Sequence, residues 1–322
     1  MMDAASRSLI ERAAAHLRRR NEEAAAQAAQ PLAANGDWGN VAVPAQPART
    51  ARPQPAAAAP QNPSAAPRQR RRMAPEPVAH SRQVSINAGA LHQHGIALPS
   101  AGRSRIAEEF RIVKRQVVAK FLDEVDSDPE AQKNRMIMVT SAKPGEGKSF
   151  TAINLALSIA SEQDLKVLLI DLDTRNHAVS EMMGIPAGRG LTDLLSNPDI
   201  DFADVVLRTN MPNLAVMPAG HPDNRGPELL SSKRTREMFD EMTQRYSDRF
   251  IIFDAPSCLA SSDPATLAGL VGQVVFVVEA DQTQQEEVEA AVALVRACPN
   301  ISLLLNKVRA SATDQFGSYS NY

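Results

Sequence analysis

The feature that most constrains this chain is a short loop with two glycines between a predicted strand and a predicted helix. Residues 142–149 read Ala-Lys-Pro-Gly-Glu-Gly-Lys-Ser; the apolar run 136–142 leads into them and SFTAINLALSIA continues from Ser149. Two glycines in such a loop allow the backbone angles that turn successive N–H groups inward, which forms an anion-binding concavity. The helix that begins near Lys148 adds the positive end of its dipole. The loop therefore predicts a phosphate-binding site.

Each residue type in this loop suits the phosphates of a nucleotide. The segment matches the P-loop pattern, with Ala142 where the commonest form has glycine. Lys148 can reach the β- and γ-phosphates, and the Ser149 hydroxyl can ligate magnesium. A chance glycine-rich turn is the alternative, and the flanking strand and helix argue against it. The expected nucleotide contacts are Pro144, Gly145, Glu146, Gly147, Lys148, Ser149 and Phe150.

Strand-like and helix-like segments alternate after the loop. The apolar runs are 136–142, 167–171, 214–219, 250–256, 274–280 and 302–308. Near-continuous apolar runs are typical of strands covered on both faces. Helical patterns lie at 148–162, 189–196, 227–246, 262–270 and 283–297. The alternation predicts an α/β fold with right-handed crossovers and a doubly wound, mostly parallel sheet.

Two of these runs end in acidic residues. Asp171 and Asp173 are two residues apart on an extended segment, so their side chains point to the same side. At the carboxyl end of a parallel strand that side opens onto the ligand crevice. The pair can supply a base and a magnesium ligand; an ordinary strand end or helix cap is the alternative. Asp254 ends the run 250–253, which would place its carboxylate beside the magnesium.

The charge distribution divides the chain into an arm and a body. Residues 1–105 contain fourteen arginines, no lysine and six acidic residues, a net charge of +8, whereas the remainder carries −10. We assign 1–32 to a helix that docks a partner and 33–103 to an Ala/Pro/Arg-rich linker. The linker has too few large apolar side chains to offset its ordering entropy, so we expect it to be disordered. Residues 104–308 form the folded domain and 309–322 a flexible tail.

Several classes of protein are disfavoured by what the sequence contains. No stretch approaches the roughly 20 apolar residues of a membrane span, and the start does not resemble a secretory signal. Cys258 and Cys298 show no metal-ligand spacing and fit a reducing compartment. The arginine run 68–72 can contact anionic lipid or nucleic acid; we prefer a solvated linker and expect no nucleic acid. The sequence therefore predicts a cytoplasmic protein.

Taken together, the three motifs resemble the Walker A, A′ and B motifs of bacterial tyrosine kinases, which belong to the deviant Walker superfamily. Lys143 resembles that superfamily's signature lysine, which crosses to a neighbouring subunit's nucleotide. The segments 190–195 (GLTDLL) and 228–232 (ELLSS) are similar to further segments of the kinases. The resemblance covers about residues 104–322. The whole layout looks most similar to the autokinases encoded with exosortase-linked polysaccharide systems.

The resemblance implies a reaction and its residues. The chain would use ATP and Mg²⁺ to phosphorylate C-terminal tyrosines in trans, and Asp171 would accept the tyrosine proton. The implied catalytic residues are Lys148, Asp171 and Lys143, and the implied magnesium ligands are Ser149, Asp173 and Asp254. The implied phosphate acceptors are Tyr319 and Tyr322; two incidental tyrosines on a frayed end are the alternative.

The resemblance also implies partners. Glu108, Arg111 and Lys114 resemble the family's ExxRxxR oligomer-contact helix, with lysine in place of the second arginine; lysine lacks the bidentate fork of arginine. A membrane chain-length-determinant protein (a polysaccharide co-polymerase) would activate the kinase and recruit it to the inner membrane. The expected role is control of exopolysaccharide synthesis and export by a homo-oligomer. A MinD- or ParA-like ATPase and an ATP-binding scaffold without phosphotransfer are the alternatives.

Overall fold

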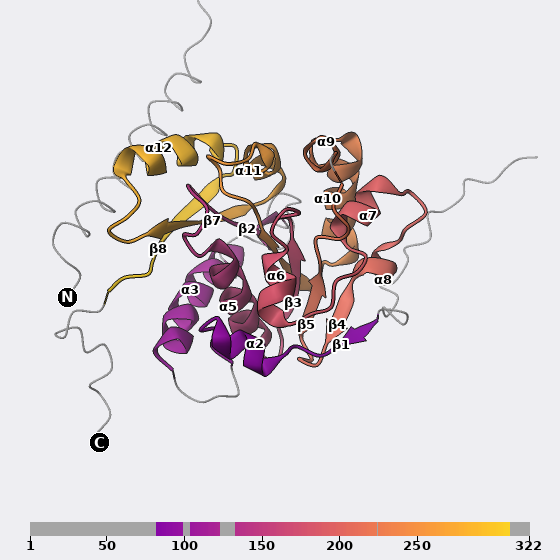
Figure 1. Ribbon diagram of the computed structural model, residues 1–322, viewed down its shortest axis with the longest axis horizontal. Coiled ribbons are helices and arrows are strands. Elements are labelled where there is room, and N and C mark those ends of the chain that lie inside the picture. The colour runs from indigo at the N-terminus through magenta and orange to yellow at the C-terminus, as the bar shows by residue number, and fades with distance from the viewer. Residues whose placement is uncertain (1–81, 99–103, 123–132, 224, 310–322) are drawn as a thin grey trace, which may run out of the picture. The chain divides into compact units, whose positions relative to one another are not determined.

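One sheet of eight strands organises the computed structural model, which describes residues 82–98, 104–122, 133–223 and 225–309 (Figure 1). The strand order is β1-β4-β5-β3-β6-β2-β7-β8, and β4 with β5 is the only antiparallel pair in the described sheet. This arrangement confirms the predicted, mostly parallel α/β fold of a P-loop NTPase. The strands are β1 (Gln83–Val84), β2 (Met136–Ser141), β3 (Lys166–Asp171), β4 (Leu207–Thr209), β5 (Leu214–Met217), β6 (Arg249–Asp254), β7 (Gln273–Glu279) and β8 (Asn300–Asn306).

Helices connect these strands and cover both faces of the sheet (Figure 1). They are α2 (Ala88–Gln93), α3 (Arg105–Leu122), α5 (Lys148–Ala160), α6 (Ala178–Met183), α7 (Leu191–Ser196), α8 (Phe202–Val205), α9 (Gly226–Leu230), α10 (Lys233–Arg245), α11 (Asp263–Leu267) and α12 (Gln285–Leu294). None of the described helices is both long enough and apolar enough to cross a membrane.

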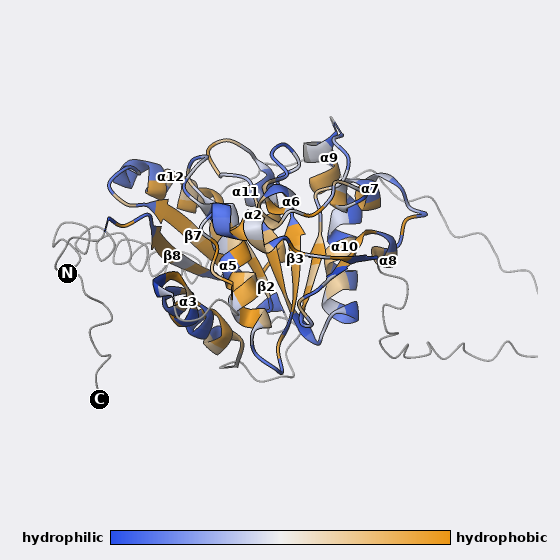
Figure 2. Ribbon diagram, turned by 60° about the horizontal axis from the view of Figure 1, so that its bottom comes forward, coloured by the Kyte–Doolittle hydropathy of each residue, from blue (hydrophilic) through white to orange (hydrophobic). Residues whose placement is uncertain are grey.

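The central strands are apolar on both sides because helices pack against both sides. Successive residues of β6 illustrate this: Ile252 belongs to the core beneath α5, whereas the Phe253 ring stacks on Phe239 of α10 with centroids 4.8 Å apart. Every residue of β2 is buried. Figure 2 shows the hydrophobic strands β2 and β3 between helices whose outer faces are hydrophilic. The burial therefore explains the near-continuous apolar runs in the sequence.

Residues 82–98 differ from the expectation that they belong to a linker. The strand β1 pairs in parallel with β4, and α2 is capped by the Asn87 side chain, which accepts from two backbone N–H groups. Val84, Ile86, Leu91 and Ile96 are buried in the same core as α5. Four well-spaced apolar side chains therefore anchor a segment whose overall composition resembles that of a linker. The folded domain begins earlier than residue 104.

Some helices also begin or end at residues other than those predicted from the sequence. The predicted helix 227–246 is two helices, because the Ser232 side chain accepts from the Thr235 N–H and starts α10 afresh. The predicted helix 262–270 is α11 followed by one 3₁₀ turn. The short elements α6, α8 and β4 were not expected. The predicted N-terminal helix within 1–32 and the tail with Tyr319 and Tyr322 lie outside the described residues.

The core role of residues 82–98 can be tested with Leu91→Ala, because the Leu91 side chain is completely buried. Truncating a buried leucine leaves a cavity, so the free energy of unfolding should fall by about 2–4 kcal/mol. Urea unfolding of the full chain measures this change. Gln93→Ala on the exposed face of the same helix is the control. Equal stabilities for both variants would exclude α2 from the core.

Candidate active site

The phosphate loop joins β2 to α5, and its backbone is left-handed at both glycines. Gly145 has a φ of 90° and Gly147 a φ of 95°, which residues with a Cβ rarely adopt. A Cβ atom at Gly147 would also overlap the side-chain amide of Asn306. Gly147 is the N-cap of α5 and provides no side-chain cap. The N–H groups of the first helical turn are therefore available to an anion.

Contacts from two distant segments brace this loop. The Glu146 carboxylate is buried and accepts hydrogen bonds from the Lys143 N–H at 2.7 Å and from the Thr283 hydroxyl. At the end of β8, the Asn306 amide donates to the Glu146 carbonyl at 2.9 Å. The Lys307 ammonium donates to the Gly145 backbone carbonyl at 2.7 Å. The Glu146 side chain thus supports the loop, and a contact between its backbone and a nucleotide stays a prediction.

Two buried carboxyl groups lie side by side behind the loop. Asp171 and Asp254 are register partners in the parallel strands β3 and β6, and both are fully buried. Among the described residues, no group forms a hydrogen bond of normal geometry with Asp171 Oδ2 or with either carboxylate oxygen of Asp254. Burial, and then the neighbouring Asp254 charge, raises the pKa of Asp171 well above its ordinary value. Burial also raises the pKa of Asp254 to about 7, opposed by the Lys148 charge and the nearby Ser149 hydroxyl.

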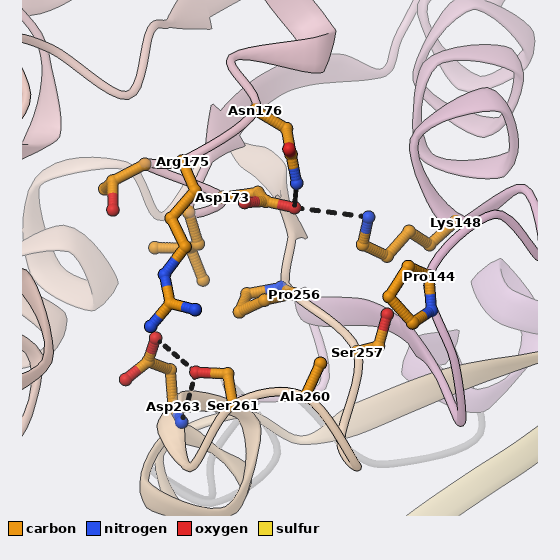
Figure 3. Close-up of a pocket in the computed structure, with 12 residues that line it drawn as sticks. Pro144, Lys148, Asp173, Arg175, Asn176, Pro256, Ser257, Ala260, Ser261 and Asp263 are labelled. Atoms are coloured by element: carbon orange, nitrogen blue, oxygen red, sulfur yellow. Dashed lines mark hydrogen bonds and ion pairs between the residues drawn. The ribbon is translucent and has the colours of Figure 1, made fainter.

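Asp173 connects these acids to the phosphate loop. Its Oδ2 forms an ion pair with Lys148 Nζ at 3.2 Å and accepts a hydrogen bond from the Asn176 amide at 2.9 Å (Figure 3). Its backbone N–H donates to Asp171 Oδ1 at 3.0 Å. The structure therefore brings together the loop lysine and the strand-end acids that the sequence singled out. Asn176 was not expected, because nothing in its local sequence distinguishes it from an ordinary turn residue.

An open cleft lies next to this ion pair. Three segments line it: the phosphate loop and Lys148, the chain after β3, and the chain between β6 and α11 (Figure 3). Its lining residues are Pro144, Lys148, Leu172, Asp173, Thr174, Arg175, Asn176, Pro256, Ser257, Ala260, Ser261 and Asp263. The cleft therefore adjoins the Lys148 side chain and the phosphate loop.

Lys143 is half-exposed at the start of the loop. Its ammonium pairs with the Glu287 carboxylate of α12 at 2.7 Å, and this hydrogen bond raises the pKa of Lys143. Sequence reasoning missed Glu287 together with Thr283, Asn306 and Lys307. Their positions were the available signal, because they lie at or shortly after the carboxyl ends of β7 and β8, at the same sheet edge as the loop.

The residues expected at an oligomer contact lie on α3. Glu108 and Arg111 are exposed and form an ion pair with each other at 2.5 Å. Lys114 is buried and pairs with Glu162, just beyond the end of α5. Lys114 therefore contacts its own domain, whereas Glu108 and Arg111 are exposed on the same helix.

The Phe150 ring, expected near the nucleotide, packs edge-on against Phe110 of α3, with centroids 6.0 Å apart.

This chain is similar to several known proteins. A family model described as an AAA domain matches residues 134–300. Tyrosine-protein kinase YwqD of Bacillus subtilis is 29% identical over 235 residues, which are 72% of this chain and 94% of YwqD. Tyrosine-protein kinase CpsD of Streptococcus agalactiae is 32% identical over 194 residues, 59% of this chain and 82% of CpsD. The crystal structure of the chimerical protein CapA2B2 matches with a TM-score of 0.58 and 26% identity, over 72% of this chain and 96% of that one.

The raised pKa of Asp254 predicts a stabilising substitution. A carboxyl group whose pKa is higher in the folded than in the unfolded protein destabilises the fold as it ionises, here as pH rises from about 4 to about 7. Asp254→Asn should therefore raise the free energy of unfolding of the metal-free protein near pH 8, by on the order of 1–4 kcal/mol. The gain should shrink towards pH 4.

Urea unfolding in EDTA at both pH values measures this effect. Asp240→Asn, an exposed carboxylate of α10, is the matched control and should change stability little at either pH. A stability gain that does not depend on pH, or no gain near pH 8, would contradict the assigned cost of ionising Asp254.

Proposed function

This chain belongs to the family of bacterial tyrosine-protein kinases, and we propose that it uses Mg-ATP to phosphorylate Tyr319 and Tyr322 of a neighbouring copy. The observation that carries the proposal is the cluster of buried carboxyl groups beside the phosphate loop. A loop that only binds phosphate does not need a base, whereas transfer to a tyrosine does. Asp171 supplies a buried carboxyl group, and its raised pKa makes its carboxylate a stronger base.

The carboxylates suit a divalent cation. Burying an unpaired carboxylate is costly, and Asp254 has two oxygens without partners among the described residues. Ser149, Asp173 and Asp254 would hold Mg²⁺, since hard cations prefer oxygen ligands. Bound magnesium neutralises charge on the β- and γ-phosphates.

Three groups of the chain perform the transfer: the loop N–H groups, Lys148 and Asp171. The loop N–H groups bind the phosphates, and Lys148 exchanges its ion pair with Asp173 for the β- and γ-phosphate oxygens. Asp171 accepts the proton of the incoming tyrosine. The phenol oxygen forms its bond to the γ-phosphorus while the bond to the bridging oxygen breaks and ADP leaves. Positioning and charge stabilisation supply most of the catalysis, as is usual in phosphoryl transfer.

A second copy completes the site in this proposal. Lys143 reaches across to the neighbour's nucleotide, which requires that its ion pair with Glu287 opens. Glu108 and Arg111 on the exposed face of α3 contact the neighbouring copy. The similarity to the chimerical protein CapA2B2 supports a second component as activator. For this chain it would be a membrane chain-length-determinant protein that recruits the kinase to the inner membrane and links it to exopolysaccharide synthesis and export. The exosortase link stays a prediction.

Trans phosphorylation can be measured by intact and peptide mass spectrometry. We mix full-length Lys148→Met, which keeps its tyrosines, with full-length Tyr319→Phe/Tyr322→Phe, which keeps its phosphate loop, and add Mg-ATP. Phosphate should appear on Tyr319 or Tyr322 of the Lys148→Met chain. Each variant alone should remain unmodified, because one lacks the donor site and the other the acceptors. The activator's cytoplasmic segment is added in a parallel series.

The alternatives make different predictions in the same experiment. A MinD- or ParA-like ATPase would release phosphate from ATP and leave every tyrosine unmodified. A regulatory scaffold would assemble with ATP equally well with and without the two tyrosines. Failure to find phosphotyrosine with the activator present, despite ATP binding, would refute the kinase proposal.

A further inference from the structure

Arg175 is a charged residue at the edge of the cleft. Its side chain is exposed and lines the cleft. Among the residues that the structure describes, none forms a hydrogen bond or ion pair with its guanidinium group. Of the other charged groups of the lining, Lys148 pairs with Asp173, whereas Asp263 accepts from the Ser261 hydroxyl at 2.7 Å and its carboxylate lies on the same side of the cleft as Arg175 (Figure 3). An arginine kept at a cleft without a partner is available to a ligand.

The position of Arg175 separates it from the phosphate site. Figure 3 shows Lys148 and Pro144 on one side of the cleft, and Arg175 with Ser261 and Asp263 on the opposite side. The phosphates bind at the loop, so they occupy the Lys148 side. Arg175 therefore lies at the end of the cleft that is away from the phosphate loop.

The walls between these two ends suit an aromatic ring. Pro144, Pro256 and Ala260 contribute apolar surface to the lining. Sites for small aromatic groups combine apolar walls with a few polar groups that set orientation. The phenol ring of a tyrosine fits this chemistry, whereas a serine or threonine side chain would leave the walls uncovered.

The C-terminal tail has the complementary charge. Residues 310–322 contain one acidic residue, Asp314, and no lysine or arginine. A guanidinium group binds carboxylates and backbone carbonyls through a rigid fork of donors. We infer that Arg175 is a positioning residue that binds the tail of a neighbouring copy and aligns its tyrosine in the cleft. This inference rests on the proposed function.

Arg175→Ala tests the inference in the full-length donor that carries Tyr319→Phe/Tyr322→Phe. The acceptor is the full-length Lys148→Met chain, titrated at saturating Mg-ATP. Loss of Arg175 should raise the KM for the acceptor chain by about tenfold, as expected for one charge-assisted contact. The kcat and the KM for ATP should stay unchanged. Arg175→Lys should recover part of the loss, and Arg296→Ala, an exposed arginine after α12, should match the parent donor.

A binding measurement keeps the inference independent of catalysis. Fluorescence anisotropy follows a labelled peptide of residues 310–322 on full-length protein loaded with Mg²⁺ and a non-hydrolysable ATP analogue. Arg175→Ala should raise the Kd of the peptide by about the same tenfold factor. An unchanged Kd would overturn the inference, as would a lower kcat or a higher KM for ATP, which would assign Arg175 to the phosphates. Peptide binding that depends on Arg175 without any phosphotyrosine would refute the proposed function alone.

Discussion

The rest of this structure must accommodate two buried carboxyl groups on neighbouring strands. The parallel register of β3 and β6 makes Asp171 and Asp254 partners, so neither can move away from the other without breaking the sheet. Their ionisation works against folding, and the burial of the central strands must offset it. A protein selected for stability alone would replace one of them. The proposed function accounts for their presence in the core.

The phosphate loop and the central sheet could be predicted because their signals are local. The glycines with φ near 90° and the mostly apolar, fully buried strand β2 can each be recognised from a few neighbouring residues of the sequence. The strand-end acids were also predictable, since parallel strands bring their carboxyl ends to one edge. The fold class and the acids around Lys148 follow from these rules.

What could not be predicted depends on contacts between distant residues. The segment 82–98 has a two-residue strand and a six-residue helix, too short for periodicity to reveal. Its backbone is tied to residues far along the chain: Asn87 N–H donates to the Met183 carbonyl at 3.0 Å. Lys114 shows the same limit, because its position in a motif suggested an outward contact, whereas Glu162 holds it inward. Arg175 was not singled out from the sequence, because only the folded chain places it on the cleft opposite Lys148.

The hydrogen bonds from the end of β8 to the phosphate loop have a consequence for how the site forms during synthesis. Asn306 lies 160 residues after the Glu146 carbonyl that it binds, and Lys307 follows it. During synthesis the glycine-rich loop leaves the ribosome long before β8 exists. The nascent chain therefore contains the phosphate-binding motif well before the contacts that support the loop can form. The strand β8 must first pair with β7, and only then can Asn306 and Lys307 reach the loop.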